Sequence, residues 1–414
     1  MKTTPFPAIK LGVDMLSNET SLPAGAIREG VNIDIDRAGN FSRRPGYSQV
    51  VAGSGFHSVR ALIQKGWVLV AQNEQLRILN PATYALSTLY VLNSGDPVDY
   101  FEHDGNVYFS NRTTIGWVPY GSGTAGPLGV PTPNVPTLAT SPDGSLLAGN
   151  YAVALSLVNG RGEESGLTDY AYIDLVSGGS VLLSNLTVAT GCKIRVYLSN
   201  PDGEVVYLNT EFTAAVQSVT ISSATFLKQA ETFGLVPMTP GEIIRGYNGR
   251  LYTVKDDTIT FSEPMRYGLT SIAYNQIKMS GPITIFEPVI DGIYVGAGTK
   301  VWFLAGTDPT KFQQILVSNC RAIPRSSTTV PGEHFNPQLV DPTHPVAVWL
   351  STSGYVVGQP GGKVVELQPD RVRIPGNHVG RSVFLLRNGR KQVVTPVNST
   401  NAAAFGTAVD TILP

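Results

Sequence analysis

Two short runs of apolar, aromatic and β-branched residues, joined by a tight polar turn, recur six times along the chain. In each run, large side chains alternate with small or polar ones or follow one another directly, which is typical of half-buried or fully buried strands. Such a pair of runs around a tight turn predicts a β-hairpin. The six predicted hairpins span 66–79, 105–118, 249–263, 292–306, 354–367 and 381–394.

The spacing of these hairpins indicates a repeated structural unit. The equivalent residues Trp67 and Tyr108 are 41 positions apart, and Tyr252 and Tyr294 are 42 apart. A four-stranded propeller blade occupies roughly 40 to 45 residues, and such a sheet buries its faces only against its neighbours. The last two intervals, of 61 and 29 residues, depart from the period. We therefore expect a β-propeller with irregular blades.

The interval of 144 residues between Tyr108 and Tyr252 holds one blade and about 100 further residues. A stiff linker containing Pro131, Pro133 and Pro136 comes first. Short strands then follow at a spacing of roughly 8 to 12 residues, separated by Gly, Asn-Pro and Asp-Gly turns, which favours a β-sandwich.

The predicted organisation has three parts. Residues 1–136 hold an N-terminal segment and the first propeller blades, 137–236 an inserted β-sandwich, and 237–414 the remaining blades. Within the insertion, 224–234 is the most helix-like stretch and predicts a short helix before the chain returns to the propeller at Leu235.

Composition supports an all-β class with frequent turns. Charged residues make up 15% of the chain, against roughly 25% in an average soluble domain, while 43 Gly and 29 Pro disfavour long helices. The net charge of −1 gives no long-range attraction for polyanions, so any contact with nucleic acid must be local. The sequence lacks a signal-peptide pattern and a run of roughly 18 apolar residues, so we expect a protein made in the cytoplasm without membrane insertion.

Motifs for cofactors and metals are weak. The glycines of 121–126 match G-x-G-x-x-G, but Pro127 follows where a dinucleotide site needs a helix. Asn32, Asp34 and Asp36 resemble the first ligands of a calcium loop, but the later Gly and Glu positions hold arginines. A strand that turns at 38–39 is the better interpretation. We expect neither a metal nor a cofactor.

Candidate catalytic groups are equally weak. Glu163 and Glu164 are adjacent, as are Asp256 and Asp257, so in a strand their side chains point to opposite faces and cannot flank one glycosidic bond. The two cysteines, Cys192 and Cys320, and the five histidines form no nucleophile or zinc motif. We therefore expect no enzymatic activity.

The stretch 371–391 has a strong charge bias. It contains no Asp or Glu, and six basic residues: Arg371, Arg373, Arg381, Arg387, Arg390 and Lys391. Such a local patch suits contact with phosphates or with an acidic partner, whereas the simpler alternative is a solvated outer strand. Arg387, Arg390 and Lys391 are the strongest candidates for contact because they flank an Asn-Gly turn.

The segment 11–50 resembles the opening of a tail family of short-tailed bacteriophages, the tail nozzle or tail-hub proteins, also called packaged-DNA stabilisation proteins. The matching positions are Gly12, Leu22, Pro23, Gly25, Arg28, Val31, Asn32, Asp34, Gly39, Arg43, Arg44, Pro45 and Gly46. Further segments similar to the family lie at 149–166, 193–203, 243–264 and 288–306, so the resemblance covers most of the chain.

This resemblance implies a structural protein of the virion tail. It implies a β-propeller core with a fibronectin type III-like sandwich, and six copies in a ring below the portal and adaptor proteins. The ring would retain packaged DNA, contact it transiently and without sequence specificity, and conduct it during ejection. The alternative from another class is a propeller-type tail protein that binds or degrades carbohydrate on the host surface.

Overall fold

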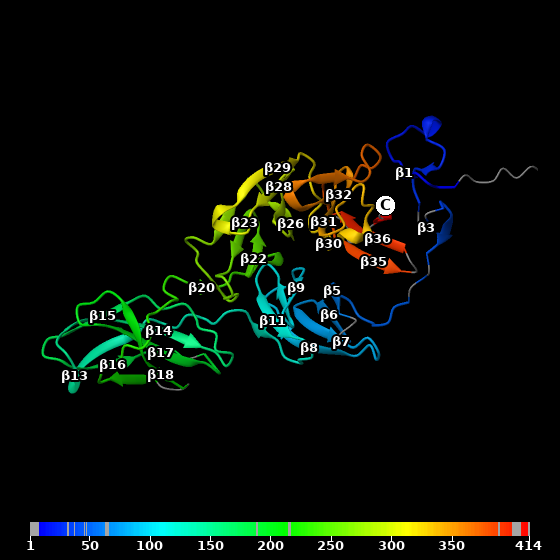
Figure 1. Ribbon diagram of the computed structural model, residues 1–414. Coiled ribbons are helices and arrows are strands. Elements are labelled where there is room, and N and C mark those ends of the chain that lie inside the picture. Colours follow the sequence, from blue (N-terminus) through cyan, green and yellow to red (C-terminus); the bar gives the residue numbers. More distant parts are fainter. Residues whose placement is uncertain are drawn as a thin grey trace, which may run out of the picture.

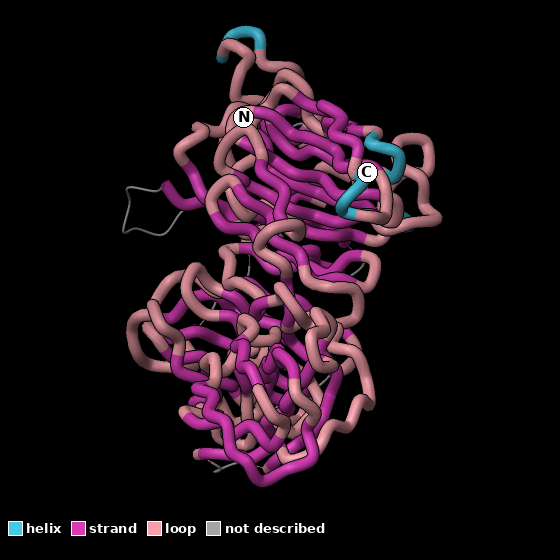
Figure 2. Tube along the Cα trace, turned by 90° about the vertical axis from the view of Figure 1, so that its left-hand side faces the viewer, coloured by secondary structure: helices cyan, strands magenta, loops and turns pink. Residues whose placement is uncertain are grey.

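The computed structural model has an all-β architecture in which the helices are single 3-10 turns (Figures 1 and 2). It describes residues 8–412 apart from 31–32, 37, 45, 47, 63–65, 188, 214–216, 388–389 and 400–406. The 3-10 turns are η1 (Glu19–Ser21), η3 (Pro309–Lys311), η4 (Gly332–His334) and η5 (Pro360–Gly362).

Six four-stranded antiparallel sheets, numbered here in chain order, form the main body. The first contains β5 (Phe56–Leu62), β6 (Trp67–Gln72), β7 (Gln75–Leu79) and β8 (Leu86–Val91), and the second β9 (Asp99–His103), β10 (Asn106–Ser110), β11 (Ile115–Pro119) and β12 (Gly126–Pro127). The third contains β21 (Ile243–Tyr247), β22 (Arg250–Lys255), β23 (Thr258–Phe261) and β25 (Gln276–Lys278), and the fourth β26 (Ile283–Val289), β27 (Gly292–Ala297), β28 (Lys300–Ala305) and β29 (Gln313–Ser318). The fifth contains β30 (Thr328–Val330), β31 (Val346–Ser351), β32 (Gly354–Gly358) and β33 (Val364–Glu366), and the sixth β34 (His378–Gly380), β35 (Val383–Arg387), β36 (Arg390–Ser399) and β37 (Thr407–Ile412). In the sixth sheet, β36 pairs with β34, β35 and β37.

All six predicted hairpins are confirmed by strand pairing. They correspond to β6–β7, β10–β11, β22–β23, β27–β28, β32–β33 and β35–β36. Local turn chemistry explains this success. Asn73, Asp256 and Gly298 take positive φ angles of 50°, 54° and 61° at three of the turns, and these residue types tolerate the left-handed conformation that tight hairpins require.

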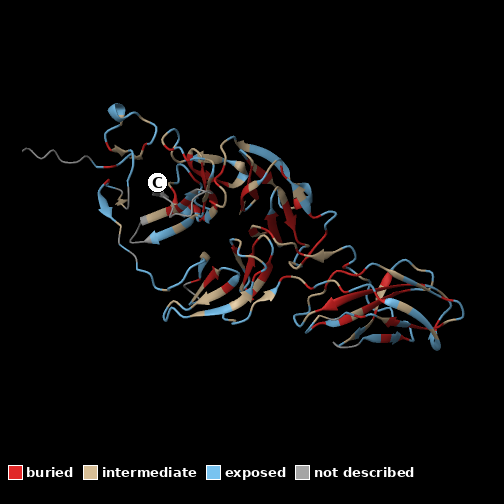
Figure 3. Cartoon of the chain, turned by 180° about the vertical axis from the view of Figure 1, so that it is seen from behind, coloured by how far each residue is buried: buried red, intermediate tan, exposed pale blue. Residues whose placement is uncertain are grey.

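Successive sheets of the body pack face to face through apolar clusters. One cluster joins each consecutive pair, from the first and second sheets to the fifth and sixth. Figure 3 shows the buried residues on the strands that face neighbouring sheets. Between the fourth and fifth sheets, the rings of Tyr294 and Trp349 lie 5.3 Å apart and both side chains are fully buried. Burying a large apolar side chain contributes roughly 1.5 to 3 kcal/mol, so these contacts stabilise the packing of the fourth sheet on the fifth.

Residues 137–221 form a separate unit of two sheets, which projects from the body in Figure 1. One sheet has the order β13 (Thr137–Leu146), β16 (Gly179–Ser184), β19 (Ser218–Ile221), and the other β15 (Ala171–Leu175), β14 (Gly149–Val158), β17 (Lys193–Ser199), β18 (Val206–Phe212). Both sheets contribute to one apolar core, in which Leu155, Val181 and Val196 are completely buried. The unit therefore has its own core.

The predicted helix over 224–234 is wrong. This segment runs beside the edge strand β18, where the Leu208 N–H donates to the Lys228 carbonyl at 2.7 Å and the Leu227 N–H donates to the Leu208 carbonyl at 3.0 Å. These hydrogen bonds between the segment and β18 satisfy backbone groups that a helix would pair internally. Tertiary pairing thus overrides the local helix preference.

Arg161 connects the two-sheet unit to the body, and Glu231 connects the segment that follows the unit. The Arg161 guanidinium carbon lies 3.4 Å from the ring centroid of Trp117, in β11, and Arg266 forms an ion pair with Glu231. The short pair of β20 (Val236–Pro237) and β24 (Leu269–Thr270) follows where the chain re-enters the body.

The N-terminal segment contains two small strand pairs. They are β1 (Gly12–Val13) with β2 (Ala26–Ile27), and β3 (Ile33–Ile35) with β4 (Phe41–Arg43). The β3–β4 pairing confirms the predicted strand that turns at 38–39. Asp34 in β3 forms an ion pair of 2.7 Å with Arg44.

Candidate functional site

A network of charged side chains joins strands from different sheets, and the buried Asp99 lies at its centre. The Asp99 side chain, at the start of β9, is only 6% exposed. Its carboxylate accepts hydrogen bonds from Arg245 at 2.5 Å, from Arg381 at 2.8 Å and from the Ile244 N–H at 3.0 Å. Burial raises the pKa of Asp99, but the two guanidinium groups and the Ile244 N–H outweigh this effect and hold that pKa at about 2.

The network continues from Arg245 to the fourth and fifth sheets. Arg245 in β21 lies 3.3 Å from the carboxylate of Glu287 in β26, and the hydroxyl of Thr329 in β30 donates to Glu287 at 2.6 Å. Burial lowers the pKa of Arg245, but the negative charges of Asp99 and Glu287 raise that pKa by more than burial lowers it, so the guanidinium stays protonated. Polar contacts therefore connect the leading strands of the second to fifth sheets, and Arg381 adds the sixth.

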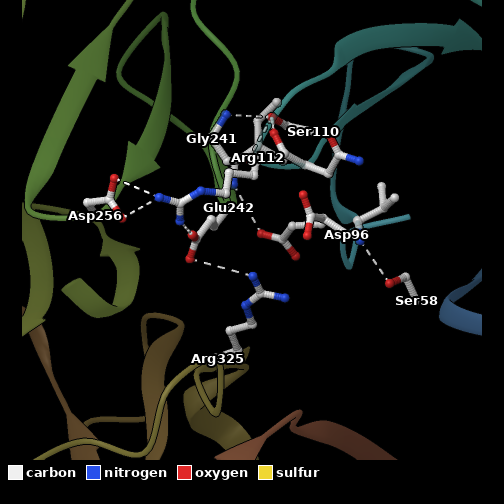
Figure 4. A network of polar contacts seen from close by, with 12 residues as sticks. Ser58, Asp96, Ser110, Arg112, Gly241, Glu242, Asp256 and Arg325 are labelled. Atoms are coloured by element: carbon white, nitrogen blue, oxygen red, sulfur yellow. Dashed lines mark hydrogen bonds and ion pairs between the residues drawn. The ribbon is translucent and has the colours of Figure 1, made fainter. Parts of the chain in front are cut away.

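A second arm of the network lies between the second and third sheets (Figure 4). Arg112, in the β10–β11 turn, forms ion pairs with Glu242 and, at 2.8 Å, with Asp256. Arg325 lies 3.6 Å from the other oxygen of Glu242. Burial and the nearby charge of Arg381 lower the pKa of Arg325. Next to these pairs, Ser110 donates to the Gly241 carbonyl at 2.7 Å.

The two arms are balanced in charge. Four carboxylates, Asp99, Glu242, Asp256 and Glu287, face four guanidinium groups, Arg112, Arg245, Arg325 and Arg381. Guanidinium groups do not give up their protons in proteins, and each of these carboxylates already has a cationic partner. The arrangement is suited to fixing the sheets relative to one another.

An aromatic pocket of about 120 Å³ lies between the second and third sheets. Phe101 stacks against His103 and Tyr108, with centroids 6.0 and 6.5 Å apart, and the Tyr267 hydroxyl lies 3.1 Å from Nε2 of His103. Arg250 also lines the pocket. Burial raises the pKa of Tyr108 to about 12. Ring faces with a few polar groups suit a small cyclic or apolar ligand.

The glycine motif and the two cysteines lie outside both the charged network and the aromatic pocket. Residues 120–122 form a turn, and the glycine motif runs into the strand β12 rather than a helix. Cys192 is buried, Cys320 is half-buried, and both are free thiols. Within the described residues, no group of three or more His, Cys, Asp or Glu side chains could hold a metal ion. In the same part of the chain, no helix has the length and apolar character needed to cross a bilayer.

The structure separates the members of the predicted cationic stretch 371–391. Arg371 donates to the Leu11 carbonyl at 3.0 Å, and its own carbonyl accepts from the Met15 N–H at 2.7 Å, so it anchors the N-terminal segment. Arg381 belongs to the charged network.

The other four members of the stretch differ in exposure, and the side chains of two of them are not described. Arg373 is exposed and Lys391 is half-buried. Arg387 and Arg390 pair across the β35–β36 hairpin, and their side chains lie outside the described residues. Arg373, Arg387, Arg390 and Lys391 therefore remain the candidates for contact with DNA or an acidic partner.

The charged network was not among the sites predicted from the sequence. Its signal is a single charged residue inside an apolar strand, as in IIRGY around Arg245 and ITIFEPV around Glu287. A charged residue in such a place is rarely buried without a partner. The pattern would have identified Arg245 and Glu287, but not the partners with which they pair.

No family model and no curated protein sequence matches the chain. Among solved structures, the N-terminal domain of Nup159 is 12% identical, with 81% of this chain and 71% of that chain covered and a TM-score of 0.28. KlHsv2 with loop 6CD replaced by a Gly-Ser linker is 8% identical, with 87% and 97% covered and a TM-score of 0.29. The WD40 domain of SCAP from fission yeast is 7% identical, with 87% and 84% covered and a TM-score of 0.27. Likeness at this level carries no argument about function.

Proposed function

We propose that the six body sheets form a β-propeller and that the two-sheet unit is an inserted, fibronectin type III-like β-sandwich. Two observations support this. Each consecutive pair of body sheets shares one apolar cluster, as blades do in a radial arrangement. The charged network also joins the leading strands β9, β21, β26 and β30, which in a propeller surround the axis.

We further propose that the protein is a structural component of the tail nozzle or hub of a short-tailed phage. In this role six copies form a ring below the portal and adaptor, retain the packaged DNA and conduct it during ejection. The observation that carries the proposal is the charge-balanced network, which locks the sheets of the body together and leaves its acids and bases paired. A rigid, non-enzymatic body is what a tail tube under internal pressure requires. The similarity of residues 11–50 to the tail family supports the location in a phage tail.

A second candidate function is carbohydrate binding on the host surface, and the aromatic pocket favours it. Sugar rings pack their C–H faces against aromatic side chains, and the pocket offers Phe101, Tyr108 and Tyr267 beside the polar groups of His103 and Arg250. A pocket of this size accepts one ring at most.

Electron microscopy of the virus that encodes this chain tests the proposal. Gold-labelled antibodies against the chain should bind the tail, and a reconstruction should show six copies around the DNA path. Copies located only in the capsid, or in infected cells but not in particles, would contradict the tail role, and threefold or twelvefold copies would contradict the hexamer. Binding to a host glycan that is lost in Tyr267→Ala would favour the second candidate.

A further inference from the structure

The interface between the sixth sheet and the first differs from the other interfaces of the body. Each consecutive pair from the first sheet to the sixth shares an apolar cluster. Among the described residues, no such cluster joins the sixth sheet to the first. In the proposed propeller these two sheets are neighbours, because the ring closes between them. The name seam is used below for this interface.

The first sheet has an apolar row on the face that points away from the second sheet. Leu62 and Leu69 pack on the second sheet, and their neighbours in the strands point to the opposite face. On that face the register aligns one residue from each strand: Ala61, Val68, Leu79 and Leu86. Ala61 is exposed, and the other three are half-buried. Polar groups of the same face lie farther along the strands, where Arg77 donates to Gln72.

The sixth sheet has an apolar face of the same kind. Phe384 and Val393 pack on the fifth sheet. Their neighbours in the strands therefore point to the opposite face, and they are Val383, Leu385 and Val394. Val383 and Leu385 are 46% and 40% exposed, and Val394 is half-buried. In a ring of six sheets, this face is the one turned towards the first sheet.

Val98 tethers the two faces at one end. Its carbonyl accepts a hydrogen bond of 3.1 Å from Arg381, and its N–H donates one of 2.8 Å to the Ser58 hydroxyl. Ser58 lies in β5 shortly before Ala61, and Arg381 shortly precedes Val383. Val98 is completely buried, so it keeps the beginnings of both faces close together. In Figure 1, β35 lies beside β5 and β6.

We propose that the sixth sheet is a flap that closes the seam about Val98, with Val383 and Leu385 packing against the row that contains Ala61 and Val68. Two surfaces tethered in this way meet at an effective concentration in the millimolar range, so the first sheet is a better partner for the flap than a second copy in dilute solution. Closure removes both apolar faces from water, which favours it. This inference rests on the proposed propeller arrangement and adds a moving part to it.

Disulfide trapping tests the closure in the full-length protein, with Cys320→Ser to remove the half-buried thiol. Oxidation should join Ala61→Cys to Val383→Cys or to Leu385→Cys within one chain, because a disulfide needs Cα atoms within about 7 Å of each other. The control pair combines Ala61→Cys with Leu386→Cys. Leu386 is 63% exposed, but it lies on the opposite face of β35, so the control pair should form no disulfide within one chain.

The alkylation rate of single cysteines gives a second readout. Leu385→Cys should react at least about tenfold more slowly than Leu386→Cys, because only the former is covered when the flap is closed. Adding Val68→Asp should remove this difference, since closure would then bury an unpaired charge.

The inference is overturned if neither seam pair forms a disulfide, if the control pair forms one equally well, or if the two alkylation rates are equal. A disulfide that joins two chains would also overturn it, because a second copy would then fill the seam. Antibody labelling of the tail is independent of these results, so failure of the closure and failure of the proposed function can be distinguished.

Discussion

The guanidinium of Arg381 donates a hydrogen bond of 2.8 Å to the carboxylate of Asp99, across 282 positions of the chain. Arg381 also donates to the Val98 carbonyl at 3.1 Å. Apolar clusters join each sheet of the body to the next, but among the described residues no such cluster joins the sixth sheet to the first two. The Arg381–Asp99 ion pair thus connects the sixth sheet of the body to the second sheet.

Replacing Arg381 should destabilise the protein. In Arg381→Ala the buried Asp99 keeps Arg245 but loses its second cation. Breaking a fully buried ion pair costs roughly 3 to 5 kcal/mol. We expect a smaller loss, of about 2 kcal/mol in the free energy of unfolding, because Arg245 remains and solvent screens Arg381, whose side chain is 43% exposed. Urea denaturation monitored by circular dichroism measures this loss.

The matched control is Arg373→Ala, since Arg373 is exposed and belongs to the same basic stretch. Its stability should change by less than about 0.5 kcal/mol. Equal effects of the two substitutions would show that the Arg381–Asp99 pair contributes no special stability.

The low pKa of Asp99 predicts a defined acid sensitivity. Its folded-state pKa of about 2 lies below the ordinary value of 3.8, so the folded state favours the charged carboxylate. This contribution is fully present above pH 3.8 and is lost as the pH falls from there towards 2. The shift corresponds to roughly 2 kcal/mol.

In Asp99→Asn this acid dependence should disappear. Unfolding free energies of the two proteins should differ at pH 7 and converge as the pH falls from about 4 to 2. A constant difference over that window would mean that Asp99 does not titrate as its surroundings require.

The hairpins could be predicted from the sequence because each depends on residues close in the chain. Turn residues such as Asn73 and Asp256 lie between two runs of strand-forming residues, and the pairing of those runs is local. The segment 224–234 shows the limit of such local reasoning. Its backbone pairs with β18, and this pairing is not visible in its own composition.

The charged network could not be predicted for a related reason. Arg112 and Asp256 are 144 positions apart, and Arg245 and Asp99 are 146 apart. Their meeting depends on how whole sheets pack. The charge bias of 371–391 is visible in the sequence, but the pairing of Arg381, whose side chain is 43% exposed, with the buried Asp99 is not.

Gly358 in β32 should be intolerant of even a small side chain. A Cβ atom there would lie 2.6 Å from ring carbons of Tyr294 and 2.8 Å from Trp349, and both rings are fully buried. Overpacking a core of this kind costs roughly 1 to 3 kcal/mol. Thermal unfolding should therefore show a clear loss of stability in Gly358→Ala.

Gly123 provides the comparison, because a Cβ there would meet nothing within 4 Å. Gly123→Ala should change stability by no more than about 0.5 kcal/mol. If Gly358→Ala were equally neutral, the two aromatic rings would have to shift without cost, contrary to the close packing between the fourth and fifth sheets.

The inserted unit should be removable without unfolding the body. A Cβ atom on Gly166 would lie 1.8 Å from the Leu235 carbonyl oxygen and 3.3 Å from the Thr132 hydroxyl, so the two connecting segments run beside each other. Deleting 133–234 and joining Thr132 to Leu235 through a short Gly/Ser linker therefore spans only a small gap. Each part has its own apolar core, so the body that remains should keep a cooperative thermal transition and a β-type circular dichroism spectrum. An unfolded deletion variant, beside a folded full-length protein, would show that the body depends on the inserted unit and that the two form one folding domain.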